Sequence, residues 1–126
     1  MRLNQVTAPA LDLDRSVAFY KMLGFRLIVL NDHYARFEVP DGDGTFSLHL
    51  TKDASGAGNG AVICFECDDL DARMAALKAE GIVFDTDIVD QPWLWREAWL
   101  TDPAGVKLVL FYAGDIRRNP PWRLKD

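Results

Sequence analysis

Two segments of the chain, residues 12–25 (DLDRSVAFYKMLGF) and 69–82 (DLDARMAALKAEGI), share a pattern at a constant offset of 57 residues. Each begins with an aspartate, a residue suited to capping the N-terminus of a helix. Apolar residues then recur at helical spacing. Each segment reaches a glycine, Gly24 or Gly81, the residue type that commonly follows a helix C-terminus. We therefore predict two copies of one amphipathic helix.

The sequence on either side of these helices repeats as well. A strand-like segment precedes each predicted helix and three more follow it. The expected strands are residues 3–8, 25–30, 34–39 and 45–51 in the first half, and 61–67, 83–87, 95–101 and 106–112 in the second. This order predicts an α+β fold of two tandem βαβββ modules within one domain, residues 1–126. Module 1 covers about 1–53, a Gly-rich linker 54–60 and module 2 about 61–113. An extended tail covers 114–126, and Trp122 is expected to anchor it on the body or on a second subunit.

Alternation of apolar and polar residues assigns the two faces of each predicted sheet. The faces expected under the helices carry Ala35, Phe37, Phe46 and Leu48 in the first module and Ala98, Leu100, Leu108 and Leu110 in the second. The opposite, concave faces carry Tyr34, Arg36, Glu38, Ser47 and His49 in the first module and Glu97, Trp99, Val109 and Phe111 in the second. Such a mixed polar and aromatic face is typical of a ligand cleft or an interface.

Length and composition narrow the classes of function. A chain of 126 residues, of which 49% are hydrophobic, suits one globular domain. The net charge of −5 argues against a nucleic-acid partner, and no apolar run approaches the roughly 20 residues of a membrane span. No signal peptide is evident. We expect a cytoplasmic protein in which Cys64 and Cys67 are reduced and structural, because residues three apart on a strand point to opposite faces.

Residues 91–99 (QPWLWREAW) are the most unusual stretch of the chain. Trp93, Trp95 and Trp99 offer large flat apolar surfaces, and Arg96 and Glu97 add both charges. One interpretation is an aromatic-lined pocket for a planar or cationic small molecule, oriented by Arg96 or Glu97. The other is that the tryptophans pack this segment onto the sheet or onto a second subunit, while Arg96 pairs with Glu97. The sequence leaves both interpretations open.

Residues 11–25 (LDLDRSVAFYKMLGF), the later turn 102–105 (DPAG) and the repeated βαβββ order together resemble the vicinal oxygen chelate superfamily. This superfamily includes glyoxalase I, extradiol dioxygenases, fosfomycin-resistance enzymes and bleomycin-resistance proteins, and the resemblance covers nearly the whole chain. It implies a curled mixed sheet around a cleft, and a homodimer. For metal-dependent members it also implies four metal-ligand positions, which correspond here to Gln5, His49, Val62 and Val109.

Two of these four positions have no atom that can bind a metal, because valine has no lone pair to donate, whereas a well-held catalytic ion needs at least three protein ligands. We therefore expect no metal cofactor. A divalent ion (Zn, Ni, Mn or Fe), if one binds, is expected to use Gln5 and His49, with Glu97, Glu38 or His33 as a substitute third ligand.

The leading prediction is a protein with a small-molecule cleft that binds an organic compound or transforms it without a metal. In the enzymatic version, His49 and Glu97 are the catalytic acid–base residues. The residues predicted to contact the ligand are Gln5, Tyr34, Arg36, Glu38, Ser47, Trp93, Trp95, Arg96, Trp99 and Phe111. The alternatives are a metal-dependent lyase or isomerase of the glyoxalase I kind, a dioxygenase, or a subunit whose cleft serves only in assembly.

Overall fold

The structure is a computed structural model that describes residues 1–53 and 60–125. The predicted linker, 54–60, lies outside the described residues except for Gly60. The chain forms two compact units. The first comprises Met1–Val62 together with Thr101–Lys107, and the second comprises Ile63–Leu100 and Leu108–Asp126.

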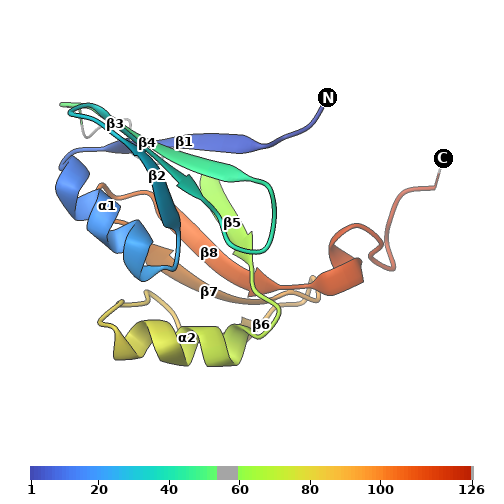
Figure 1. Ribbon diagram of the computed structural model, residues 1–126. Coiled ribbons are helices and arrows are strands. Elements are labelled where there is room, and N and C mark those ends of the chain that lie inside the picture. Colours follow the sequence, from blue (N-terminus) through green and yellow to red (C-terminus); the bar gives the residue numbers. More distant parts are fainter. Residues whose placement is uncertain (54–59, 126) are drawn as a thin grey trace. The chain divides into compact units, whose positions relative to one another are not determined.

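The first unit is a four-stranded sheet with one α-helix (Figure 1). Its elements are β1 (Gln5–Ala10), α1 (Leu13–Met22), β2 (Arg26–Leu30), β3 (Tyr34–Glu38) and β4 (Thr45–Leu50). The strand order is β1-β4-β3-β2. Strand β1 runs parallel to β4, and the other neighbouring strands are antiparallel. The sheet is therefore mixed, as a βαβββ order requires when the helix connects the first strand to the far edge.

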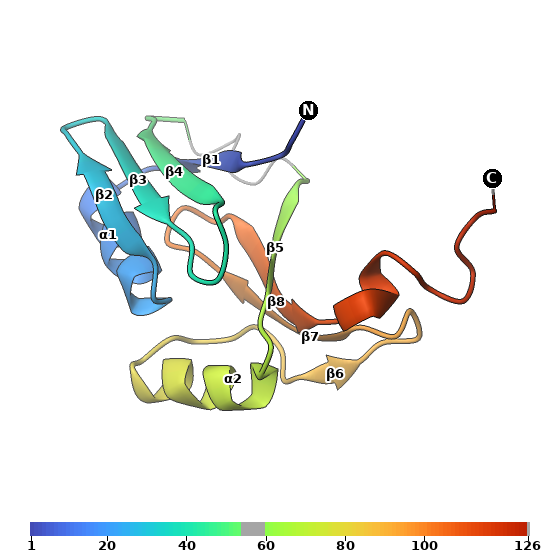
Figure 2. The same ribbon diagram turned by 45° about the vertical axis from the view of Figure 1, so that its right-hand side comes forward.

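The second unit repeats this plan (Figure 2). Its elements are β5 (Val62–Glu66), α2 (Leu70–Ala79), β6 (Val89–Asp90), β7 (Arg96–Thr101) and β8 (Lys107–Tyr112), followed by the short 3₁₀-helix η2 (Gly114–Arg117). The strand order β5-β8-β7-β6 repeats the order of the first unit. The predicted α+β class and the two βαβββ units are confirmed. Neither α-helix, at 10 residues each, is long enough to cross a membrane.

The helix boundaries follow the sequence repeat residue for residue. Asp12 accepts a hydrogen bond from the backbone N–H of Arg15 at 3.1 Å, and Asp69 accepts one from Ala72 at 3.1 Å. After the two helices, Gly24 and Gly81 adopt φ angles of 94° and 100°, which residues with a side chain rarely tolerate. The start and stop signals therefore work in both copies as predicted.

The apolar faces also lie where alternation placed them. In the first unit, Phe37, Phe46 and Leu48 are at most 1% exposed beneath α1. Tyr20 of α1 packs its ring on Phe46, with 4.5 Å between ring centroids. In the second unit Ala98, Leu100 and Leu108 are fully buried.

A buried aspartate joins Tyr20 to the turn 102–105. Asp102 is 4% exposed and accepts a hydrogen bond from the Tyr20 hydroxyl at 2.6 Å through Oδ2. Its Oδ1 accepts the backbone N–H groups of Ala104 and Val106 at 2.8 and 2.9 Å. These three bonds fix the turn and explain why Thr101–Lys107 belongs to the first unit although it follows most of the second in sequence.

Two sequence-based expectations are corrected. Residues 83–87 form no regular strand, because Asp85 and Thr86 both donate their backbone N–H to the Trp99 carbonyl and the Thr86 side chain accepts the Trp99 N–H. Only an isolated bridge, Phe84 to Leu100, remains, and the edge strand is β6. The tail is not wholly extended, since η2 begins it. Trp122 is 56% exposed, so it is not anchored on the described part of this chain, and its anchoring on a second subunit stays a prediction.

Candidate functional site

The face of the first sheet opposite α1 is polar, as predicted, and we call it the polar face. The strand register places Tyr34 beside His49 and Arg36 beside Ser47. Thr45 lies beside Gln5 on the parallel pair β1–β4. Three strands thus bring these side chains onto one surface.

Hydrogen bonds connect the centre of the polar face. The hydroxyl groups of Tyr34 and Ser47 lie 2.6 Å apart, and Arg36 donates its Nε–H to the Tyr34 oxygen at 2.9 Å. The Arg36 guanidinium carbon lies 5.3 Å from the centroid of the same ring. Beside them, Thr45 donates to Gln5 Oε1 at 2.8 Å. Burial alone raises the pKa of the Tyr34 phenol, but hydrogen bonds from Ser47, Arg36 and Gln5 and the charge of Arg36 lower it overall.

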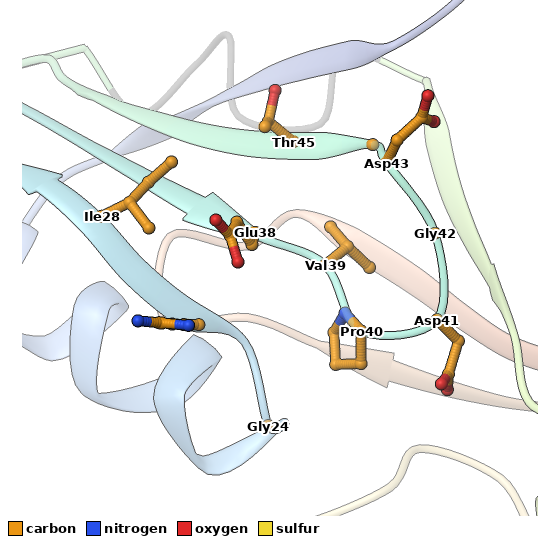
Figure 3. Close-up of a pocket in the computed structure, with 11 residues that line it drawn as sticks. Gly24, Ile28, Glu38, Val39, Pro40, Asp41, Gly42, Asp43 and Thr45 are labelled. Carbon is orange, nitrogen blue, oxygen red and sulfur yellow. The ribbon is translucent and has the colours of Figure 1, made fainter.

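His49 and Glu38 lie at opposite ends of the polar face. His49 is exposed beside a hollow of about 320 Å³ that Pro9 and Asp53 also line. Among the described residues no side chain forms a hydrogen bond with its imidazole, so no neighbouring group orients the ring for proton transfer. Glu38 lines a larger hollow of about 670 Å³ beside the turn 40–44, where Asp41 and Asp43 add two more carboxylates (Figure 3). Neither hollow has the aromatic lining that the Trp-rich stretch led us to expect.

That aromatic lining lies in the second unit, on a surface we call the aromatic face. Trp95 stacks on Phe111 with 4.1 Å between ring centroids and 12° between ring planes. Trp95 and Trp99 both pack against the buried cluster of Val109, Phe111 and Ala113 and remain partly exposed. Trp93 is not part of this cluster; it lies in the turn before β7 and is 44% exposed.

A carboxylate is buried within the aromatic face. Glu97 is 5% exposed, and its Oε1 accepts hydrogen bonds from Gln91 Nε2 at 3.1 Å and Trp99 Nε1 at 3.2 Å. Among the described residues no donor binds Oε2. On β5 of the same sheet, burial and then the negative charge of Glu97 raise the pKa of the Cys64 thiol. The thiol is therefore held in its protonated form.

Arg96 does not join this surface. Its Nη2 binds Asp71 of α2 at 2.6 Å and its Nη1 binds Asp90 of β6 at 3.0 Å. The hydrogen bonds from Arg96 lower the pKa of Asp71. Because successive residues of a strand point to opposite faces, Arg96 and Glu97 cannot form the pair that one interpretation of the sequence proposed. Arg96 ties α2 to the sheet, and we do not retain it as a ligand-orienting residue.

A family model described as the Glyoxalase/Bleomycin resistance protein/Dioxygenase superfamily matches residues 2–110. The chain belongs to this superfamily. The match spans both βαβββ units, including Asp12, Tyr20 and the Asp102 turn. Among curated proteins no sequence matches the chain significantly.

Solved structures of the glyoxalase/bleomycin-resistance type share this fold. A bleomycin resistance determinant encoded on transposon Tn5 is 22% identical with a TM-score of 0.75, covering 90% of this chain and 99% of its own. A bleomycin-binding protein complexed with bleomycin is 24% identical with a TM-score of 0.70, covering 89% and 98%. Lactoylglutathione lyase from Agrobacterium tumefaciens is 20% identical with a TM-score of 0.72, covering 88% and 92%. At these identities the likeness establishes the fold alone.

The residues present do not fit the metal that many members of this superfamily use. Of the four corresponding positions, Val62 and Val109 provide only hydrocarbon, and Val109 is 2% exposed within the aromatic face. The oxygen of Gln5 already accepts a hydrogen bond from Thr45. No group of three or more His, Cys, Asp or Glu side chains within residues 1–53 and 60–125 is arranged to hold a metal ion.

Two polar contacts were missed at the sequence level. Thr45 lies on the same face as Ser47 and His49, so alternation along β4 was enough to include it. Gln91 precedes a turn, and no periodic signal links it to Glu97. Its role depends on where the turn returns the chain, and this is decided only in the folded unit.

Proposed function

We propose that this superfamily member binds a small organic molecule on the aromatic face, with a planar ring against Trp95 and Trp99 and a cationic group at Glu97. The observation that carries the proposal is the Glu97 carboxylate, 5% exposed and set among aromatic side chains. Under this proposal the protein binds and sequesters its ligand without the help of a metal ion.

The electrostatics of Glu97 favour a cation. An ionised carboxylate is costly to bury unless it is paired or fully hydrogen-bonded. Glu97 receives two hydrogen bonds, both from neutral donors and both at Oε1. A cationic group at Oε2 would offset the remaining cost, and the faces of Trp95 and Trp99 attract cations through their π electrons. The bleomycin complex of a fold relative is consistent with ligand binding by this type of protein.

We further propose a cytoplasmic homodimer. Ile28, Val29 and Leu30 of the edge strand β2 are all exposed, and a sheet edge with apolar side chains favours association with a second surface. Cys64 and Cys67 form no disulfide with each other, which is consistent with a reducing compartment.

The ligand proposal is tested by isothermal titration calorimetry with proflavine, a planar aromatic cation, and with the anionic analogue anthracene-2-carboxylate. We expect proflavine to bind the wild type, and Trp95→Ala to weaken binding by about tenfold or more because the stacking surface is lost. Trp122→Ala is the matched control, since Trp122 lies in the tail and is 56% exposed. Equal binding of both compounds, or equal loss in both variants, contradicts the proposal.

The metal-dependent lyase is the competing function, and metal analysis distinguishes it. After exchange against Zn, Ni, Mn and Fe(II), we expect far less than one metal ion per chain, because two of the four family positions are valine. His33→Ala is the matched control for His49→Ala, since the His33 backbone is held in an exposed turn by Asn31. One metal ion per chain that is lost only in His49→Ala, together with formation of lactoylglutathione, would establish the lyase instead.

A further inference from the structure

We propose that the polar face of the first unit is a binding site for an oxyanion, a carboxylate or a phosphate, received by the guanidinium of Arg36 together with one hydroxyl proton of the Tyr34–Ser47 pair. This site lies on a different unit from the aromatic face and rests on different residues. The two proposals can therefore fail separately.

Arg36 is fixed in place but mostly unused as a donor. A guanidinium has five N–H groups in a rigid fork, which matches the two oxygens of a carboxylate or phosphate. Arg36 uses only its Nε–H, on the Tyr34 oxygen, and its guanidinium carbon lies 5.3 Å from the centroid of the Tyr34 ring. No carboxylate in the described part of the chain forms an ion pair with it. Both terminal nitrogens remain available.

Arg96 is the comparison for Arg36, because all of its guanidinium nitrogens have hydrogen-bond partners. Its Nε and Nη2 bind the two oxygens of Asp71, and its Nη1 binds Asp90. Each of its three nitrogens has a partner, which leaves no fork for a ligand. The two arginines therefore differ in available donors and not in charge.

Ser47 and Tyr34 supply a further donor at the same place. Ser47 is 0% exposed, and its Oγ lies 2.6 Å from the Tyr34 hydroxyl oxygen. The two hydroxyls have two protons between them, and one proton serves their mutual hydrogen bond. The Tyr34 oxygen also accepts from Arg36, and the Gln5 side chain hydrogen-bonds to the same phenol. The second hydroxyl proton is available to an anion that lies against Arg36.

The charges around this position favour an anion. Glu38 shares the strand and the face of Arg36, its register partner on β2 is Arg26, and it forms no ion pair with Arg36 among the described residues. His49 is opposite Tyr34 on β4. Arg36, flanked in register by Ser47 and without an ion-pair partner among the described residues, is thus the positive charge at the centre of the polar face. The lowered pKa of Tyr34 agrees with a positive local potential.

The experiment follows ionisation of the Tyr34 phenol by ultraviolet difference absorbance near 295 nm, with Tyr34→Phe to assign the signal. Inorganic phosphate and benzoate are titrated separately, at ionic strength held constant with chloride. A bound anion opposes formation of the phenolate, so we expect a saturable rise in the pKa of Tyr34. The arm that saturates at lower concentration identifies the preferred oxyanion.

Variants connect the effect to the Arg36 fork. Arg36→Gln is expected to weaken the apparent affinity for the preferred anion by about tenfold or more, and Arg36→Lys, which keeps the charge but loses the fork, to give an intermediate loss. Arg96→Gln and Trp95→Ala should bind the anion like the wild type. Circular dichroism verifies folding, and Arg36→Lys carries the test if Arg36→Gln does not fold. An unchanged shift in Arg36→Gln and Arg36→Lys, or no saturable shift with either anion, overturns the proposal.

Discussion

Asp102→Ala is expected to lower the free energy of unfolding by about 3–5 kcal/mol, because three buried donors lose their acceptor and each costs roughly 1–3 kcal/mol when left unsatisfied. These donors are the Tyr20 hydroxyl and the backbone N–H groups of Ala104 and Val106. Urea unfolding followed by circular dichroism measures the loss. Tyr20→Phe removes only one of the three bonds and is expected to cost about 1–3 kcal/mol.

The matched control is Asp43→Ala, in the exposed turn between β3 and β4, which should change stability by no more than about 0.5 kcal/mol. A loss in Asp102→Ala as small as in Asp43→Ala would show that Asp102 does not stabilise the first unit as described.

The hydrogen bond between Tyr20 and Asp102 also makes the stability of the protein depend on pH in the alkaline range. Burial, and then the negative charge and hydrogen bond of Asp102, raise the pKa of Tyr20 far above its ordinary value. A raised folded-state pKa means that the stabilisation is complete below the unfolded pKa of tyrosine, about 10, and is lost as the pH rises above it. The stability difference between wild type and Tyr20→Phe should therefore narrow above about pH 10.

The second large effect concerns Glu97. Glu97→Gln is expected to weaken proflavine binding by about tenfold or more, because the amide keeps an oxygen for Gln91 and Trp99 but removes the negative charge. The free energy of unfolding should stay within about 1 kcal/mol of the wild type or rise, since a buried charge is removed. Calorimetry and urea unfolding on the same preparation separate the two effects.

Glu80→Gln, at the exposed C-terminal cap of α2, removes the same charge from a residue outside the aromatic face and should alter neither quantity. If Glu97→Gln binds proflavine like the wild type, Glu97 is not the counter-ion of the ligand. If both binding and stability fall together, Glu97 is a structural residue of the aromatic face.

Much of the fold was predictable because its signals are local. Asp12 and Asp69 cap their helices through their own next turn, and Gly24 and Gly81 end them by a backbone conformation intrinsic to glycine. The two faces of each sheet followed from the two-residue period of a strand. This period alone placed Phe37 on the face under α1 and Ser47 on the polar face. Residues 83–87 were mispredicted because their hydrogen bonds depend on where Trp99 of β7 meets them after folding.

The candidate site was predictable only in part. Alternation identified Tyr34, Arg36 and Ser47 as sharing a surface. Their hydrogen bonds, and the fact that the two terminal nitrogens of Arg36 have no partner among the described residues, depend on side-chain conformations. Arg96 and Glu97 are adjacent in sequence, and one of the two interpretations of the sequence paired their charges. The pleat of β7 sends them to opposite faces, one to Asp71 and the other to Trp99.

The sequence by itself determined the repeated βαβββ order, the helix ends and the two faces of each sheet, because caps, glycine conformations and strand periodicity act over a few residues. Tertiary structure alone decided that Tyr20 and Asp102, 82 residues apart, share a buried hydrogen bond. It also decided that Arg96 forms ion pairs with Asp71 and Asp90, whereas Arg36 bonds only to the Tyr34 hydroxyl. Such contacts depend on where separate segments meet after folding, and no short-range pattern in the chain encodes that meeting.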